Sequence, residues 1–256
     1  MSRINWTREE LILAFNLYLK IPFGRMHKGN AEIIYLSKLI NRTPDAVAMR
    51  LSNFASIDPY HQSHGVTGLS GGRKQCQPIW DEFIQDKELL LFESERILAA
   101  KENILIEDKY SWIIKDISHL KGEEKIREIK TRINQNVFRQ IILSAYQNKC
   151  SISGIDIREL LVASHIIPWS KNTVERLNPE NGLCLSVLYD KAFDKGLIGI
   201  NSDYRILLSK RVTSHFNKEY YNTYFGNVEG RQIGFSGKYK PKKEFLEYHL
   251  DVVFDR

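Results

Sequence analysis

The stretch SHIIPWSKNTVERLNPENGLCLSVLYDKAFD, residues 164–194, constrains the fold more than any other part of the chain. Apolar and partly β-branched residues lead up to Pro168, and LCLSVL follows the turn signal Asn181-Gly182, so two short strands are predicted. YDKAFDKG then begins a helix that ends at Gly196, and LIGINSDYRILLS forms a further hairpin. The order strand, loop, strand, helix and hairpin predicts an α+β unit.

The polar residues of this stretch are suited to one kind of chemistry. Asp190 and Asp194 are four residues apart and therefore lie on one helix face. Carboxylate oxygens held in this way suit Mg²⁺ or Mn²⁺, and such a cation can bind a DNA phosphate and assist the leaving oxygen. His165, with a reference pKa of about 6.5, can deprotonate a water for attack on phosphorus. Asn181 can hydrogen-bond across the loop and fix the orientation of the histidine.

Each of these residues also has a purely structural explanation. A single histidine near a strand end is usually a hydrogen-bonded structural residue. Two aspartates at this spacing are often a solvated helix face, and Asn-Gly is usually only a turn. Composition and spacing alone leave both explanations open.

The N-terminal part predicts three short helices, each with a recognisable start. Thr7 caps the first, Asn30 the second, and Thr43 the third, where Pro44 takes the first helical position. The short link NRT between the last two is compatible with a helix-turn-helix. The third helix is expected to carry side chains beyond its apolar face that can reach bases or phosphates, with one more just before it: Arg50, Asn53 and Arg42. A plain three-helix module is the alternative.

The remaining segments set the predicted domain boundaries. DPYHQSHGVTGLSGGRKQCQP lacks hydrophobic periodicity and is predicted to be a long loop, with His61 and His64 exposed to solvent. The pattern from Ile79 to about Lys130 is helical. We therefore expect a helical DNA-recognition module over 1–80, connecting helices over 81–131, and an α+β domain over 132–256.

Charge and cysteine content indicate the class of partner. The formal net charge is +6, and Arg205 to Lys243 contains nine Lys/Arg and two Glu, interleaved with aromatic residues. Such a surface suits phosphate contacts, although the aromatic residues fit a core equally well. Three widely spaced cysteines favour reduced thiols and a cytoplasmic protein. The sequence shows no signal peptide and no apolar run of the roughly 20 residues needed to span a membrane.

The order of His165, Asn181, Asp190 and Asp194 resembles the HNH endonuclease motif. CSISG, ASHIIPW, NGLCLS and AFDKGLI look like the restriction-type branch of that family, over roughly residues 132–208, and EFLEYHLDVVF is also similar. The resemblance implies a ββα-metal fold, in which a hairpin and a helix surround one metal ion. It implies that His165 is the general base, that Asn181 braces the loop, and that the two aspartates are metal ligands. WTREELILAFNLY and RTPDAVAMRLSNF look like a leader module of some bacterial HNH proteins.

Two positions depart from the family pattern. Asp190 stands where the family name leads one to expect the last histidine, and Ser164 stands where many members place a further metal ligand. The cation, Mg²⁺ or Mn²⁺, is therefore expected to be held loosely and to depend on substrate phosphate or water. Cys150 is followed by Ser153 rather than by a second cysteine, so no structural zinc is expected.

The resemblance implies a metal-dependent DNA endonuclease that leaves 3′-hydroxyl and 5′-phosphate ends, in bacterial restriction or anti-phage defence. Double-stranded DNA is the expected substrate, and a homodimer is expected because cutting both strands needs two active centres. The alternatives are a nuclease that depends on modified bases and a DNA-binding regulator whose HNH fold is catalytically inactive.

Overall fold

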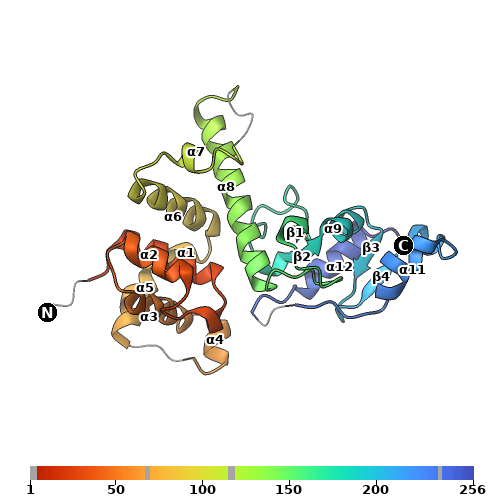
Figure 1. Cartoon of the computed structure of the whole chain (residues 1–256), viewed down its shortest axis with the longest axis horizontal. Coiled ribbons are helices and arrows are strands. Elements are labelled where there is room, and N and C mark those ends of the chain that lie inside the picture. Colours follow the sequence, from red (N-terminus) through yellow and green to blue (C-terminus); the bar gives the residue numbers. More distant parts are fainter. Residues whose placement is uncertain (1–4, 67–69, 115–118, 236–237) are drawn as a thin grey trace. The chain divides into compact units, whose positions relative to one another are not determined.

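The computed structural model describes residues 5–66, 70–114, 119–235 and 238–256. The chain divides into two compact units, Met1–Val137 and Phe138–Arg256, and each is described here by itself. The first unit is helical and the second mixes helices with two small sheets (Figure 1). The predicted α+β class, with a helical part before the nuclease-like part, is confirmed. The predicted domain limits at 80 and 131 stay a prediction.

Helices make up the first unit. They are α1 (Arg8–Lys20), the 3-10 helix η1 (Phe23–Arg25), α2 (Ala31–Leu39), α3 (Pro44–Ala55), α4 (Pro59–Ser63), α5 (Ser70–Phe83), α6 (Lys87–Lys101) and α7 (Ile106–Lys109). The long helix α8 (Gly122–Ala145) contributes residues to both units. No helix in the described part of the chain is long and apolar enough to cross a membrane.

The predicted helix starts are confirmed atom by atom. The Thr7 hydroxyl accepts from the backbone N–H of Glu10, and the Glu10 carboxylate accepts from that of Thr7, which completes a capping box. The side chains of Asn30 and Thr43 cap α2 and α3 in the same sense. These caps satisfy N–H groups that the first helical turn leaves without a partner.

Aromatic side chains form the centre of the first unit. Phe15 of α1 stacks on Phe54 of α3 at a ring distance of 4.8 Å, and the ring of Trp80 of α5 lies 5.1 Å from the ring of Phe15. The predicted long loop is wrong over most of its length, because α4 and α5 occupy it; residues 67–69 lie outside the described part. The expected solvent exposure of His61 is wrong as well: it is buried and lies 4.6 Å from the ring of Phe23.

The second unit begins with the predicted strand pair. After the short helix η2 (Arg158–Leu160), β1 (Leu161–His165) pairs antiparallel with β2 (Gly182–Ser186), which follows η3 (Pro179–Asn181). The register sets His165 opposite Gly182. Gly182 is extended, with φ −127°, so Asn181-Gly182 is not the hairpin turn that the dipeptide suggested. The glycine is needed for close packing, because a Cβ there would lie 2.4 Å from Ile142 Cδ1 of α8.

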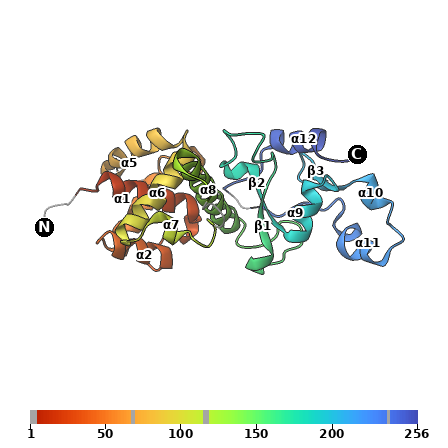
Figure 2. The same cartoon turned by 90° about the horizontal axis from the view of Figure 1, so that it is seen from above.

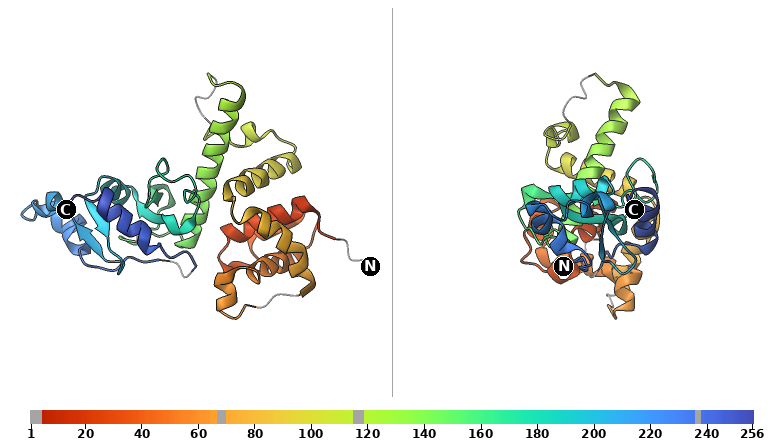
Figure 3. Two further views of the ribbon diagram at one scale, coloured as in Figure 1. Left: turned by 180° about the vertical axis from the view of Figure 1, so that it is seen from behind. Right: turned by 90° about the vertical axis from the view of Figure 1, so that its right-hand side faces the viewer.

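The remaining elements surround this hairpin. The helix α9 (Val187–Asp194) follows β2 directly and leads to the second sheet, β3 (Ile198–Ile200) with β4 (Ile206–Leu208), as predicted. After it come α10 (Lys210–Thr213), α11 (Glu219–Tyr224), the 3-10 helix η4 (Gly226–Val228) and α12 (Lys243–Val252), which packs on β3. Figure 2 shows α9 between the β1–β2 hairpin and the helices α10 and α11. Figure 3 gives the same elements from two further sides.

Candidate active site

The last residue of β1 is His165, and its ring is held on several sides. The ring stacks on Phe138 of α8 at 4.3 Å and meets the edge of Trp169 at 5.4 Å. The Nε2 atom lies 2.8 Å from the backbone carbonyl oxygen of Arg176, in the loop between β1 and β2. Neither Phe138 nor this carbonyl could be identified from the sequence motif, because one comes from a distant helix and the other is backbone.

The carbonyl contact defines how the histidine is protonated. A carbonyl oxygen can only accept, so Nε2 carries the proton and donates it. In the neutral ring the free lone pair then lies on Nδ1, to which no hydrogen bond reaches from the described residues. Burial lowers the pKa of His165, partly opposed by this hydrogen bond and by the charge of Asp190. The ring is therefore neutral near pH 7, with one basic nitrogen available.

The loop that supplies this carbonyl is fastened by Asn181. Its side chain is fully buried, and Oδ1 accepts from the backbone N–H of Ile167 at 2.8 Å. Its Nδ2 donates to the carbonyl oxygens of Ile167, at 3.2 Å, and Glu175, at 3.3 Å. Because Glu175 directly precedes Arg176, Asn181 fixes the segment that holds the histidine.

The two aspartates lie along α9. Asp190 is half-buried and Asp194 is exposed. The pKa of the Asp194 carboxyl is raised, first by partial desolvation and then by the negative charge of Asp190. Asp190 also acts on the pKa of His165. Asp190 therefore acts electrostatically on both His165 and Asp194, and the roles assigned to the three residues stay predictions.

The donor set bears on whether a metal ion fits here. Over the residues that the structure describes, no group of three or more His, Cys, Asp and Glu is placed to hold a metal. Mg²⁺ does not need such a group, because it usually binds through one or two carboxylates together with waters and substrate phosphates. A cation beside these carboxylates would also offset the negative charge of Asp190, which contributes to the raised pKa of the Asp194 carboxyl. The residues present therefore fit a divalent cation that water and substrate phosphate help to hold.

Ser164 does not add an obvious ligand. Its side chain is buried, and its Oγ has no hydrogen-bond partner among the described residues. Successive side chains of a strand point to opposite faces, so Ser164 leaves β1 on the face opposite to His165.

The residues proposed to contact DNA occupy unexpected positions. Arg50 is 7% exposed and donates to the carbonyl oxygen of Gly72, at 3.2 Å, and to Gln75, at 2.9 Å. Asn53 is buried as well, and Arg42 pairs with Glu10 at 2.9 Å. The expectation that Arg50 and Asn53 project beyond the apolar face of α3 is wrong, because α5 covers that side of the helix. Their roles in DNA binding stay predictions without structural support.

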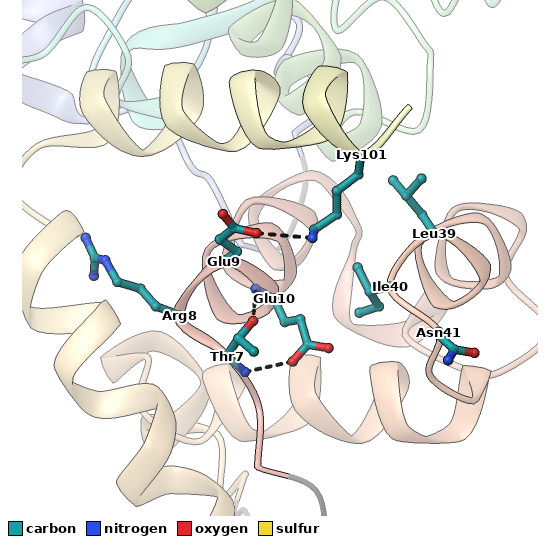
Figure 4. Close-up of a pocket in the computed structure, with 8 residues that line it drawn as sticks. All are labelled: Thr7, Arg8, Glu9, Glu10, Leu39, Ile40, Asn41 and Lys101. Atoms are coloured by element: carbon teal, nitrogen blue, oxygen red, sulfur yellow. Dashed lines mark hydrogen bonds and ion pairs between the residues drawn. The ribbon is translucent and has the colours of Figure 1, made fainter. Parts of the chain in front are cut away.

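A cavity of about 520 Å³ lies in the first unit, at the start of α1 (Figure 4). Its charged groups already have partners: Glu9 pairs with Lys101 at 3.1 Å, and Glu10 is engaged by Thr7 and Arg42. The cavity is far along the chain from His165, and its walls carry no unpaired charge that singles out a ligand.

Comparison with known proteins gives one family match, and it lies within the second unit. Residues 150–201 match the model of a family described as HNH endonuclease. This segment contains β1, β2, α9 and all four predicted residues of the site. No curated protein is similar enough to this chain to count as a relative.

One solved structure, described as a modification-dependent TagI restriction endonuclease, is similar with a TM-score of 0.31 and 15% sequence identity. The match covers 44% of this chain and 36% of the other, so this chain spans little more than a third of that protein. The likeness is too weak to argue from. The family match places an HNH endonuclease segment at residues 150–201, within the second unit, and this segment contains the β1–β2 strand pair, α9 and His165.

Proposed function

We propose that this protein hydrolyses DNA phosphodiester bonds with the help of Mg²⁺ or Mn²⁺, and that it acts in bacterial restriction or anti-phage defence. The observation that carries the chemistry is the hydrogen bond from His165 Nε2 to the Arg176 carbonyl. It leaves Nδ1 of a neutral, partly buried ring as a base. The defence role rests on the resemblance of the sequence motifs to the restriction-type branch of the family.

In this proposal His165 takes a proton at Nδ1 from the water that attacks phosphorus. The lowered pKa keeps the ring unprotonated at neutral pH, which a general base requires. Asn181 is a positioning residue, since it holds the loop that orients the ring. Asp190 and Asp194 hold the cation, which when bound supplies positive charge to the phosphate and the leaving oxygen.

The experiment is cleavage of supercoiled plasmid by the full chain, with Mg²⁺, with Mn²⁺ and with EDTA. We expect cleavage that needs the metal, its loss in His165→Ala, and DNA binding that survives in this variant, because a base activates water without holding the substrate. His119→Ala is the matched control, since this exposed histidine lies in the first unit, outside the candidate site. If His165→Ala cuts as fast as the parent, the assigned base is wrong.

One observation favours a second function, that of a DNA-binding regulator without catalysis. The described residues offer no group of three metal ligands, and Ser164 stands where many relatives have one. DNA binding without cleavage in any of the metals would support the regulator. Running the assay on methylated and unmethylated DNA tests the third reading, a nuclease that depends on modified bases.

The homodimer is also part of the proposal. One HNH centre cuts one strand, so a double-strand break by a single particle requires two centres. Light scattering of the full chain with and without DNA measures this. A monomer that only nicks plasmid would contradict it.

A further inference from the structure

Three aromatic rings project from one region of the second unit. Phe216 is 70% exposed, Tyr220 45% and Tyr224 48%. Three exposed cations lie in the same segment. We call this group the α10–α11 surface, and it consists of Lys210, Arg211, Phe216, Lys218, Tyr220 and Tyr224.

The rings are arranged on a fixed framework. Tyr220 and Tyr224 are four residues apart on α11 and so share one side of it, while Tyr221 points inward and is buried. The Tyr220 hydroxyl lies 2.5 Å from Nδ1 of His215, the residue next to Phe216. This bond ties α11 to the turn that carries the third ring.

The surface borders the helix of the candidate metal site. The hydroxyl of Tyr189, in α9, donates to the backbone carbonyl oxygen of Tyr224 at 2.6 Å, and its ring meets the edge of Phe225. Asp190 is the next residue of α9. Figure 2 shows α11 in the same C-terminal group as α9 and α10. α9, which carries Asp190 and Asp194, and α11, which carries two of the rings, are therefore joined within the second unit.

The chemistry of the side chains on the α10–α11 surface indicates which kind of partner binds there. An exposed phenylalanine ring has no hydrogen-bonding group, and clustered exposed apolar groups usually mark an interaction site. The segment from Lys210 to Tyr224 carries three cations and one carboxylate, Glu219. Arg211 approaches Asp255 at 3.7 Å, but both side chains are well exposed, so this pair leaves the cation largely available. Aromatic rings among cations suit single-stranded nucleic acid, in which bases stack on the rings and phosphates meet the charges.

We propose that the α10–α11 surface binds an unpaired stretch of DNA beside the cleavage centre. The bases stack on Phe216, Tyr220 and Tyr224, and the phosphates contact the three cations. Paired bases in a duplex are already stacked on one another, so their faces are not open to such rings. The proposal deepens the proposed nuclease function and rests on it: the enzyme would prefer DNA with an unpaired segment next to the scissile bond.

The test measures binding of labelled oligothymidylate to the full chain carrying His165→Ala, in EDTA, by fluorescence anisotropy. Phe216→Ala and Tyr224→Ala are each expected to weaken binding about fivefold or more, the loss typical of one stacked base. Trp112→Ala is the matched control, because this ring is 60% exposed but lies in the first unit. Lys218→Gln should lower the slope of log affinity against log salt by about 0.7, as for one phosphate of a single strand.

Several results would overturn the proposal. They are unchanged affinity in both ring variants, an equal loss in Trp112→Ala, or equal binding of duplex and single strand by the parent. If the rings cover a second copy of the chain instead, Phe216→Ala will shift the mass measured by light scattering and leave oligothymidylate binding unchanged.

Failure of the cleavage mechanism is distinguishable from failure of this surface. The binding assay contains no metal and no active base, so it reports on the surface alone. Plasmid cleavage by the parent and by His165→Ala reports on the centre alone.

Discussion

Asp194 is the residue that best tests the proposed cation site on α9. Its carboxyl is exposed, and the negative charge of Asp190 contributes to its raised pKa. We predict that Asp194→Asn lowers metal-dependent cleavage by at least tenfold and weakens Mn²⁺ binding in calorimetric titration. The neutral amide removes one of two charges that attract the cation. Asp203→Asn, at an exposed aspartate in the turn after β3, is the matched control and should bind Mn²⁺ like the parent. Full activity with unchanged Mn²⁺ affinity in Asp194→Asn would place the metal elsewhere.

A second residue, Asn181, tests whether the loop positions the base. Asn181→Asp keeps the acceptor for Ile167 N–H but loses both donations to backbone carbonyls and buries a carboxylate. Each unsatisfied buried group costs about 1–3 kcal/mol, so we predict a lower free energy of unfolding and slower cleavage.

Asn172→Asp is the control, because Asn172 in the same loop uses only its Oδ1, to accept from the N–H groups of Val174 and Glu175. That variant should be close to the parent in both unfolding and cleavage. If Asn181→Asp keeps parental kcat despite lower stability, Asn181 is only a structural residue.

At the scale of elements, the sequence predicted those whose signals are local. The caps at Thr7, Asn30 and Thr43 are hydrogen bonds within one turn of helix, so residue type alone identifies them. The α4–α5 segment was missed because Gly, Ser and Pro disfavour helix, whereas tertiary contacts of Trp80 and Phe83 with α1 and its neighbours stabilise it. A close approach such as Gly182 against α8 has no local signal, because the partner is distant in sequence.

The packing of α3 against α5 gives a prediction for Arg50. Its guanidinium donates hydrogen bonds to the carbonyl oxygen of Gly72 and the side chain of Gln75, both in α5. Its central carbon lies 4.6 Å from the ring centre of Trp6. We predict that Arg50→Ala lowers the free energy of unfolding by about 1–3 kcal/mol, because buried hydrogen-bonding groups lose their partner. Urea titration followed by circular dichroism measures it.

Arg73→Ala, at an exposed arginine of α5, is the control and should change stability by no more than about 0.5 kcal/mol. A variant Arg50→Ala that is as stable as the parent but binds DNA less tightly would instead support the original prediction of a DNA contact.

At the scale of the whole molecule, the four candidate site residues belong to the second unit, and the residues predicted to contact DNA belong to the first. The four residues of the candidate site lie within the segment that matches the HNH family, and the resemblance of their order to the HNH motif singled them out where local patterns left a structural explanation open. The expected exposure of Arg50 and Asn53 is wrong because amphipathic patterning cannot show that a second helix covers this side of α3. The sequence also could not show that aromatic rings of α10–α11 are exposed, because aromatic residues in such a segment fit a core and a surface equally well.

Stability of the second unit should depend on pH through His249. This residue of α12 is 2% exposed, stacks on Phe193 of α9 at 3.6 Å, and has its Nε2 3.0 Å from the Phe193 carbonyl oxygen. Burial lowers the pKa of His249 to about 4, against a reference value of about 6.5 in the unfolded chain. Between these two values the unfolded state binds more protons than the folded state, so stability falls as pH falls through this window.

We therefore predict that this histidine alone removes about 2 kcal/mol of unfolding free energy between pH 7 and pH 5, following the linkage of proton binding to folding. His249→Phe keeps a ring against Phe193 but cannot take up a proton, so its stability should lose less over the same range. The measurement is urea unfolding of the full chain and of the variant at both pH values, followed by tryptophan fluorescence and far-ultraviolet circular dichroism. Other carboxylates and histidines titrate equally in the two proteins, and their contributions cancel in the difference. Identical pH dependence in parent and variant would show that the ring of His249 accepts a proton in the folded protein without cost.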